Sequence, residues 1–323
     1  MRNHRLLCLA CGLLLLLPAC RSNPEGARQP VIGKQGTEQA AVVERRSEVL
    51  ARWARQGIRD AILLQIAGTD GLAPLPPGSV ERLRQLQQAG DWQGFADYGR
   101  ANLSAATWLS AAVRLGIVKE INWVTPYRLF DDLALAEPKL KKFLTTSSPL
   151  PAADVAAMKM EQGCLTGQAA GAILYVCSPR TLHKIDGPVL LFFDAGFSPI
   201  HYREYAQTNL ASLKGLFDEL SYRELRIQDA VAVSGVADGT APLHSTYLAD
   251  EFVEGLRKPE LFKADLPPAL WLLRDGVDDK LSAGDARLAL EEAVKALQAH
   301  PDDRPLQLLK AEAERQTRSR KER

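Results

Sequence analysis

The sequence predicts an α/β fold: a mostly parallel sheet flanked by helices, with an N-terminal helical region and a C-terminal helical pair. Short, continuous apolar segments indicate four strands, at 117–124, 172–177, 189–193 and 229–234. Strands that are apolar along their whole length are typical of parallel sheets that are buried on both faces. Segments with helical character lie between several of these strands, which favours a doubly wound arrangement.

Helical periodicity comes before the first of these strands. Apolar residues recur at intervals of three and four over 42–57, and a second apolar set continues to 58–68, so both segments are expected to be helical. Three further helical segments are expected around 83–86, 92–98 and 103–115. Between the third and fourth strands, a helix is expected over 205–220.

The end of the chain has a different pattern. A helix is expected over 286–299, followed by a turn at 300–303 and a second helix that starts at Leu306. This pair looks like one tetratricopeptide-type helix-turn-helix, but a repeat array needs about three copies to build a continuous core. Two terminal helices that pack on the sheet are therefore the favoured interpretation. The basic segment 315–323 is expected to be disordered.

These patterns divide the chain into five parts. A signal peptide is expected at 1–19 and a lipidated cysteine with a flexible tether at 20–37, where Pro and Gly are frequent. The α/β domain, with its helical N-terminal part, is expected at 38–280. The terminal helix-turn-helix follows at 281–314, and the basic tail at 315–323.

Composition excludes several classes of protein. The chain has 323 residues, of which 46% are hydrophobic and 24% charged, so it is neither disordered, collagen-like nor a coiled coil. It has 40 basic and 39 acidic residues, for a formal net charge of +1. This balance gives no electrostatic reason to expect a nucleic-acid partner.

The first 17 residues have the pattern of an export signal. Arg2 and Arg5 form a basic start, and the apolar segment 6–17 follows. Twelve residues are too few to cross about 30 Å of hydrocarbon as a permanent helix. A plain secretory signal and an N-terminal anchor helix are the alternative interpretations.

The sequence Leu17-Pro18-Ala19-Cys20 resembles the lipobox of bacterial lipoproteins, with Pro18 in place of the usual small or β-branched residue. The resemblance implies cleavage before Cys20 and lipidation of its thiol with several acyl chains, palmitate among them, which together hold a protein firmly at a membrane. Arg21 stands where an inner-membrane retention signal has Asp. In a Gram-negative cell, this implies the outer membrane and its periplasmic face.

The cysteines point to the same compartment. Cys8 and Cys11 lie in the signal and Cys20 is the lipidation site, which leaves Cys164 and Cys177 as a pair. In an oxidising compartment, such a pair is expected to form a disulfide. Two buried free thiols are the alternative, because cysteine also packs as a small hydrophobic residue.

Three residues are candidates for chemistry. Asp194 directly follows the most apolar strand, at the end where parallel sheets bind ligands. His201 and Glu204 follow with helical i, i+3 spacing, so Asp194, His201 and Glu204 are candidate ligands of a divalent metal in a hydrolase. The alternative is structural: an Asp after a strand often caps a turn or helix, and His201 then lies at the surface.

The strand that ends in Asp194-Ala195 resembles the Asp-Ala-His-x-Asp metal motif of the arginase superfamily. Gly196 stands where that family has a ligand histidine, and Ser198 stands where it has its second aspartate. Only Asp194 therefore carries over. For a degenerate arginase-like fold, the resemblance implies that the two-metal chemistry is lost or changed.

The sequence contains no complete catalytic motif. A nucleophile elbow, a phosphate loop, a dinucleotide-binding glycine fingerprint and a His-Glu-x-x-His pair are all missing. The favoured interpretation is a binding or accessory lipoprotein that is not an enzyme and needs no cofactor. One alternative is a metal-dependent hydrolase that uses Asp194 and His201. The other is a scaffold that acts through the C-terminal helices and the basic tail.

Overall fold

The computed structural model describes most of the chain between residues 39 and 321. The described residues are 39–125, 133–195, 209–221, 223–235, 237, 247–258, 261 and 269–321. The predicted signal, Cys20, the tether, His201 and Glu204 lie outside them.

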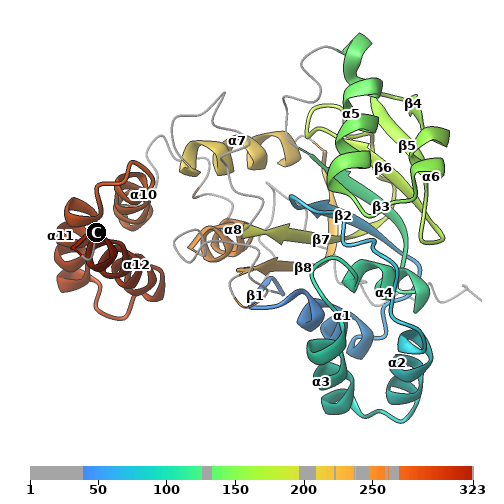
Figure 1. Ribbon diagram of the computed structural model, residues 1–323, viewed down its shortest axis with the longest axis horizontal. Helices are drawn as coiled ribbons and strands as arrows, with labels where there is room; N and C mark the ends of the chain where they lie inside the picture. The colour runs from blue at the N-terminus through green and yellow to red at the C-terminus, as the bar shows by residue number, and fades with distance from the viewer. Residues whose placement is uncertain are drawn as a thin grey trace, which may run out of the picture.

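The predicted α/β class is confirmed. The described residues form an eight-stranded sheet in the order β1-β8-β7-β2-β3-β6-β5-β4, shown in Figure 1. Every pair from β1 to β6 in this order is parallel, whereas β6–β5 and β5–β4 are antiparallel. The strands are β1 Ala41–Val43, β2 Ala61–Ile66, β3 Val118–Val124, β4 Lys159–Glu161, β5 Cys164–Ala169, β6 Ala172–Cys177, β7 Pro188–Asp194 and β8 Arg226–Val233.

All four predicted strands are present, as β3, β6, β7 and β8. A continuous apolar sequence reflects burial on both faces, most clearly in β7, whereas β3 also carries Lys119 and Glu120 near its start. In β7, for example, Leu190 and Phe192 belong to one core, while Leu191 and Phe193 belong to the core on the opposite face. This alternation between two cores is the reason that no polar residue interrupts the strand.

One predicted helical segment is wrong. Within 58–68, where a helix was expected, the chain forms β2, the strand between β7 and β3 near the middle of the sheet. Leu63 faces one core and Leu64 and Ile66 face the other. A short apolar segment buried on both faces has no period of two, so its spacing is easily mistaken for a helical one.

One face of the sheet is covered by helices from the first half of the chain. Trp108 at the start of α4 packs against Phe192 of β7, with ring centroids 4.7 Å apart, and Trp53 of α1 lies 5.9 Å from Trp108. These aromatic rings lie at the centre of this core. The helices of this half are α1 Arg46–Arg55, α2 Ser79–Gln88, α3 Trp92–Asn102, α4 Trp108–Arg114, α5 Leu133–Ser147 and α6 Ala152–Ala157.

The opposite face is covered by helices from the second half. Phe252 of α8 stacks on Phe193 of β7 at 4.2 Å and also contacts Phe217 of α7 at 5.2 Å. Buried residues of the C-terminal helices belong to this same core. The helices of this half are α7 Asn209–Ser221, α8 Tyr247–Arg257, α10 Ala269–Ser282, α11 Ala286–Ala299 and α12 Arg304–Lys321. Of these, α8 packs directly on the strands, whereas α10 contacts α7 and α12 contacts α8.

The C-terminal region is larger than the predicted pair. The expected helix at 286–299 is confirmed as α11, but α10 precedes it and packs with α11 and α12 beyond the ends of β7 and β8 (Figure 1). The expected disordered tail is also wrong up to Lys321, because α12 continues through it. Charged side chains pair along α12 at helical spacing, Lys310 with Glu314 at 3.1 Å and Arg315 with Glu312 at 2.8 Å. Such pairs stabilise a helix.

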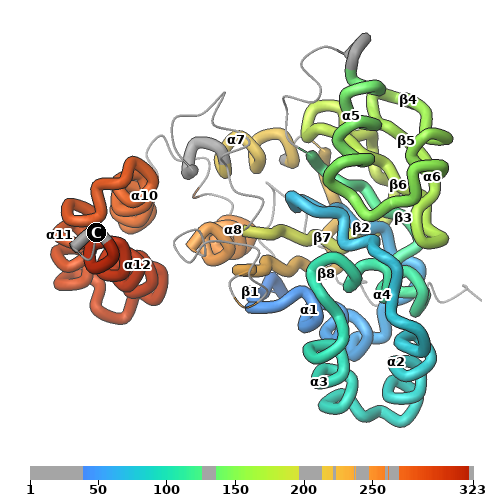
Figure 2. The backbone as a smooth tube through the Cα atoms, in the orientation of Figure 1, coloured from blue at the N-terminus to red at the C-terminus, as the bar shows by residue number. Residues whose placement is uncertain are grey.

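Segments far apart in the sequence lie side by side in the sheet. Figure 2 shows the first described strand, β1, beside β8 from the second half of the chain, and Ala41 pairs in register with Val231. Among the described residues, no helix combines the length and the apolar composition that crossing a bilayer requires.

Candidate functional site

The strand order places the candidate site at the carboxyl edge of the sheet. From β2 the chain passes to β3 and then β6 on one side, and afterwards returns to β7 and β8 on the other. The connections therefore reverse between β2 and β7, and ligands of open α/β sheets bind at the carboxyl end of such a switch point. Asp194 is the last residue of β7, so it lies where the sequence places it.

Asp194 forms a buried ion pair that the sequence did not indicate. Arg46, the first residue of α1, donates a hydrogen bond through Nη2 to Oδ2 of Asp194, and each side chain is only 2% exposed. The guanidinium compensates the charge of the carboxylate in a region of low dielectric constant. A divalent cation bound there would lie next to a fixed positive charge. The pair therefore supports a structural role for Asp194.

A second aspartate is held by the same helix. Oδ1 and Oδ2 of Asp229 in β8 accept hydrogen bonds from Nη2 and Nε of Arg52, both at 2.8 Å, and Oδ2 also accepts one from Trp53 Nε1 at 3.0 Å. The hydrogen bond with Asp229 raises the pKa of Arg52. Helix α1 is thus attached to β7 and β8 through two buried carboxylates, which explains why both aspartates stand among the buried residues of their strands.

A third buried carboxylate, Asp70, follows β2 beside the switch point. It accepts hydrogen bonds from the Ser148 hydroxyl and from the backbone N–H of Leu72 at 3.0 Å. Burial raises the pKa of Asp70, although these hydrogen bonds act in the opposite direction. Gln65 fixes the turn by donating to the carbonyls of Thr69 and Asp70. Asp70 was not identified from the sequence, because a helix was expected where β2 lies. A ligand site is expected at the carboxyl end of a strand in a parallel sheet, but not after a helix.

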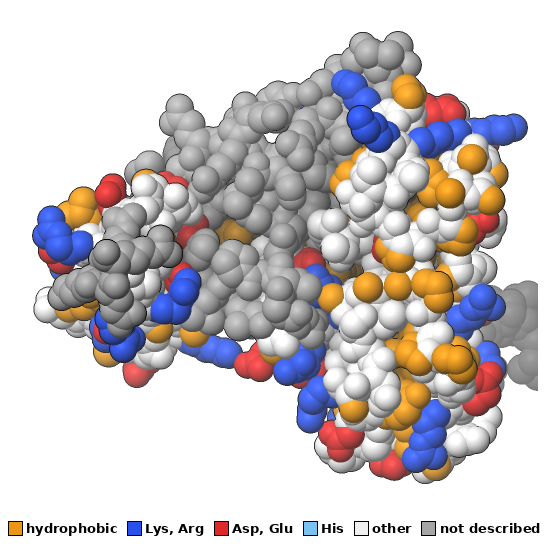
Figure 3. Space-filling view, viewed as in Figure 1, with side chains coloured by type: hydrophobic (Ala, Val, Ile, Leu, Met, Phe, Trp, Pro, Cys, Tyr) orange, Lys and Arg blue, Asp and Glu red, His pale blue; other side chains and the backbone are white. Residues whose placement is uncertain are grey.

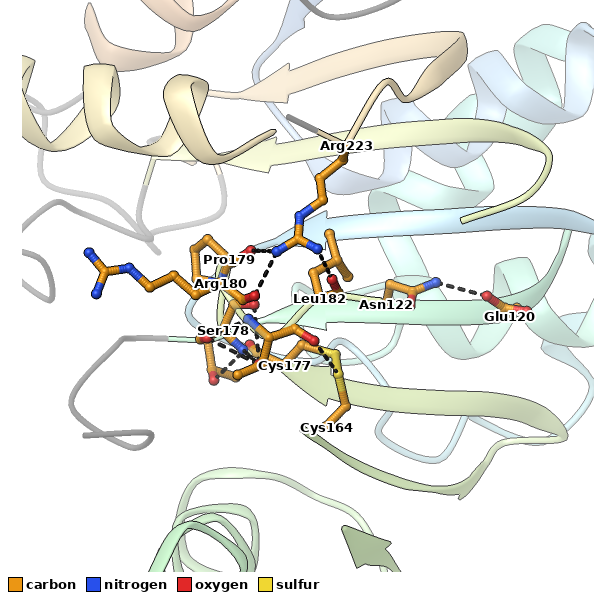
Figure 4. Close-up of a disulfide and its surroundings, with 11 residues drawn as sticks. Glu120, Asn122, Cys164, Cys177, Ser178, Pro179, Arg180, Leu182 and Arg223 are labelled. Atoms are coloured by element: carbon orange, nitrogen blue, oxygen red, sulfur yellow. Dashed lines mark hydrogen bonds between the residues drawn. A yellow bond between two sulfur atoms is a disulfide. The ribbon is translucent and has the colours of Figure 1, made fainter. Parts of the chain in front are cut away.

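The predicted disulfide is present at the same edge of the sheet. Cys164 at the start of β5 and Cys177 at the end of β6 are bonded, with sulfur atoms 2.04 Å apart (Figure 4). Both cysteines are fully buried. The alternative of two free thiols therefore does not apply to this structure.

A histidine lies beside the disulfide. Ligand atoms of Cys164, Cys177 and His183 all lie within 4.8 Å of one another. His183 belongs to the connection between β6 and β7, and its ring centroid is 4.5 Å from that of Tyr175 on β6. In the sequence, His183 follows Cys177 by six residues, a spacing that could have drawn attention to it.

A pocket of about 610 Å³ lies elsewhere, between α2, α4, α6 and the turn from β5 to β6. Its wall is largely apolar and rich in proline, with Arg114, Glu81 and Asp154 as its charged residues. Figure 3 shows hydrophobic side chains exposed on this part of the molecule. A largely apolar cavity of this size, with a few polar groups, is within the range that small ligands occupy.

The fold and this edge define an α/β protein with a doubly wound core, a disulfide and neutralised buried carboxylates. No protein-family model matches the chain, and no curated protein matches its sequence. The resemblance to the arginase superfamily stays a prediction that rests on Asp194 alone.

Proposed function

We propose that this protein is a bacterial lipoprotein, anchored through lipid on Cys20 to the outer membrane and facing the periplasm. We also propose that it binds a ligand or partner there without catalysing a reaction. The observation that carries the non-catalytic part is the buried ion pair between Asp194 and Arg46. In this pair, Arg46 engages the carboxylate of Asp194, the candidate metal ligand that the sequence places at the end of a strand.

The sequence at the start of the chain supports the anchor. Ala19 before Cys20 is typical of the lipobox. The position after the cysteine, where an aspartate would signal retention at the inner membrane, is occupied by Arg21. The disulfide between Cys164 and Cys177 supports a periplasmic location, because such bonds persist mainly in oxidising compartments.

The pocket between α2, α4 and α6 supports a binding role. Its apolar wall would exclude water from a ligand, while Ser79 and Ser110, both almost fully buried, add hydroxyl groups to the lining. Such a combination of apolar surface and few polar groups is typical of binding sites.

Membrane fractionation of cells that express the full chain tests the anchor. We expect wild type in the outer-membrane fraction, released by detergent but not by high salt. The Cys20→Ala variant should retain its signal or leave the membrane fraction. Cys11→Ala, which changes a cysteine of the apolar segment, is the matched control and should behave as wild type. If Cys20→Ala fractionates as wild type, the lipid anchor is wrong.

Metal analysis of the full chain, purified in detergent without chelator, tests the non-catalytic part. We expect no manganese, zinc or iron that depends on Asp194, so wild type and Asp194→Asn should have the same content. Asp97→Asn, which alters an exposed aspartate on α3, controls for surface binding. One metal ion per chain that is lost only in Asp194→Asn would instead favour the metal-dependent hydrolase that uses Asp194 and His201.

A further inference from the structure

We infer that Cys164, Cys177 and His183 form a binding site for a thiophilic cation, Zn²⁺ or Cu⁺, when the disulfide is reduced. The inference concerns a different part of the carboxyl edge from Asp194. It does not depend on the lipid anchor, because the three residues lie in the folded domain.

The chemistry of the three side chains suits such a cation. Two thiolates and one imidazole are the ligands that Zn²⁺ and Cu⁺ prefer, whereas Mg²⁺ and Ca²⁺ prefer oxygen. Zinc lies about 2.3 Å from sulfur and about 2.0 Å from nitrogen, so in tetrahedral geometry its ligand atoms are about 3.5–3.8 Å apart. The ligand atoms here all lie within 4.8 Å of one another. Small side-chain rotations after reduction would bring them to a common ion.

The backbone around the cysteines is held by interactions other than the disulfide. Strands β5 and β6 are paired over five residues each, from Leu165–Val176 to Ala169–Ala172. The carbonyl of Cys177 accepts hydrogen bonds from the backbone N–H of Thr125 at 2.8 Å and from its hydroxyl at 3.2 Å. Reduction would therefore free the two sulfur atoms without releasing the strands that carry them.

The connection that carries His183 is held independently as well. Figure 4 shows the Arg223 guanidinium donating to backbone carbonyls of this connection: to Pro179 at 3.0 Å, to Arg180 at 2.6 Å and to Leu182. Since none of these hydrogen bonds involves a cysteine, they persist after reduction. The loop thus keeps His183 near both sulfur atoms.

Reciprocal hydrogen bonds also close the first turn of this connection. The backbone N–H of Ser178 donates to the Thr181 hydroxyl at 2.9 Å, and the backbone N–H of Thr181 donates to the Ser178 hydroxyl at 3.1 Å. The Tyr175 ring lies against the His183 ring and limits its orientations. Three of the usual four zinc ligands are therefore arranged in advance, and water or an external ligand would complete the coordination.

The site is redox-dependent because the disulfide and the metal compete for the same sulfur atoms. Reduction requires two electrons and two protons, which a dithiol reductant supplies as it becomes a disulfide. The cation then displaces the two thiol protons and binds the thiolates. When an oxidant withdraws two electrons from the bound thiolates, the disulfide forms again and the cation leaves.

The test uses the full chain in detergent. One sample is kept oxidised, and another is reduced with a phosphine and freed of reductant under anaerobic conditions. Zn²⁺ is titrated into each against a chromophoric chelator, and Cu⁺ is titrated in a parallel series. His183→Ala removes one ligand, and His300→Ala, a histidine between α11 and α12, is the matched control. Replacement of Cys164 and Cys177 together by Ala controls for the cysteines of the first 20 residues, Cys8, Cys11 and Cys20, in any chain that keeps them.

We expect one ion per reduced wild-type chain and none for the oxidised chain. His183→Ala should bind at least about ten-fold more weakly, His300→Ala should match wild type, and the double cysteine variant should bind none. Equal affinity in His183→Ala and wild type would overturn the three-ligand site. So would a reduced chain that binds no ion while its circular dichroism stays native, or a reduced chain that unfolds.

Discussion

The side chains of Arg46 and Asp194 are each 2% exposed, so their charges are compensated mainly by each other and by nearby protein groups rather than by water. Removal of one charge from such a buried pair costs about 3–5 kcal/mol, whereas replacement of both by apolar residues is often neutral. We expect Arg46→Met to lower the free energy of unfolding by this amount. The double variant Arg46→Met with Asp194→Leu should recover most of the loss.

Urea unfolding of the two variants and of wild type, followed by circular dichroism, measures these differences. A loss of less than about 1 kcal/mol for Arg46→Met would contradict the structural role of the pair. In that case the charge of the Asp194 carboxylate is compensated without the Arg46 guanidinium, and the role of Asp194 as a metal ligand regains support.

Glu251 on α8 gives a prediction of pH dependence. Its side chain is fully buried, and the nearest atom of Arg274 lies 3.5 Å away. Burial raises the pKa of Glu251 well above its ordinary value, against the attraction of Arg274. Above the ordinary pKa, the unfolded chain loses this proton while the folded chain keeps it. Stability should therefore fall as the pH rises through this window, by about 1.4 kcal/mol per pH unit.

Glu251→Gln removes this titration. We expect the variant to resemble wild type in stability near pH 4 and to be more stable than wild type at pH 8. Urea midpoints at the two pH values measure the effect. Glu291→Gln, at an exposed position on α11, is the control and should show no such gain. An equal change at both pH values would mean that Glu251 is ionised in the folded chain.

At the scale of elements, the disulfide joins β5 to β6 across 13 residues of sequence. A cross-link of this length stabilises a protein by about 3 kcal/mol, mainly because it restricts the unfolded chain. We expect the double variant of Cys164→Ala and Cys177→Ala to lose about this much stability while keeping its secondary structure. Reduced wild type, measured without metal, should match the variant. A variant that does not fold at all would show that strand pairing depends on the bond.

The elements that the sequence predicted well are those whose signal is local. The bounds of β6 and α11 agree with the prediction, because apolar runs and amphipathic spacing act within one segment. The three-residue strand β1 was missed, since its place in the sheet comes from pairing with β8 far along the chain. The prediction for β2 failed because a segment buried on both faces loses its characteristic period.

The same distinction between local and long-range signals applies to the residues of the candidate site. Asp194 at a strand end and the cysteine pair could be predicted, because strand position and cysteine count are properties of the sequence itself. Arg46, 148 positions from Asp194, could not be predicted, because only the fold brings the two together. His183 was overlooked for the same reason: its closeness to Cys164 depends on the path of the chain between β6 and β7.

At the scale of the whole molecule, the C-terminal helices share a core with the sheet. Leu309 of α12 is fully buried in the cluster that contains Phe193 of β7 and Phe252 of α8. Elements that share one core are expected to unfold together. We therefore predict that Leu309→Ala, which should cost about 2–5 kcal/mol, shifts the entire unfolding transition and not a separate part of it.

Two signals from different parts of the molecule distinguish these outcomes. Circular dichroism follows all helices. In a Trp271→Phe background, which removes the tryptophan of α10, fluorescence reports on the tryptophans of the core on the far face of the sheet, Trp53, Trp92, Trp108 and Trp123. In Leu309→Ala, both signals should move to the same lower urea midpoint, while Arg318→Ala at an exposed position of α12 should leave them unchanged. If only the circular dichroism shifted, the C-terminal helices α10, α11 and α12, residues 269–321, would be a separately folding unit. In that case the C-terminal helices would fold independently of the sheet, as the scaffold interpretation requires.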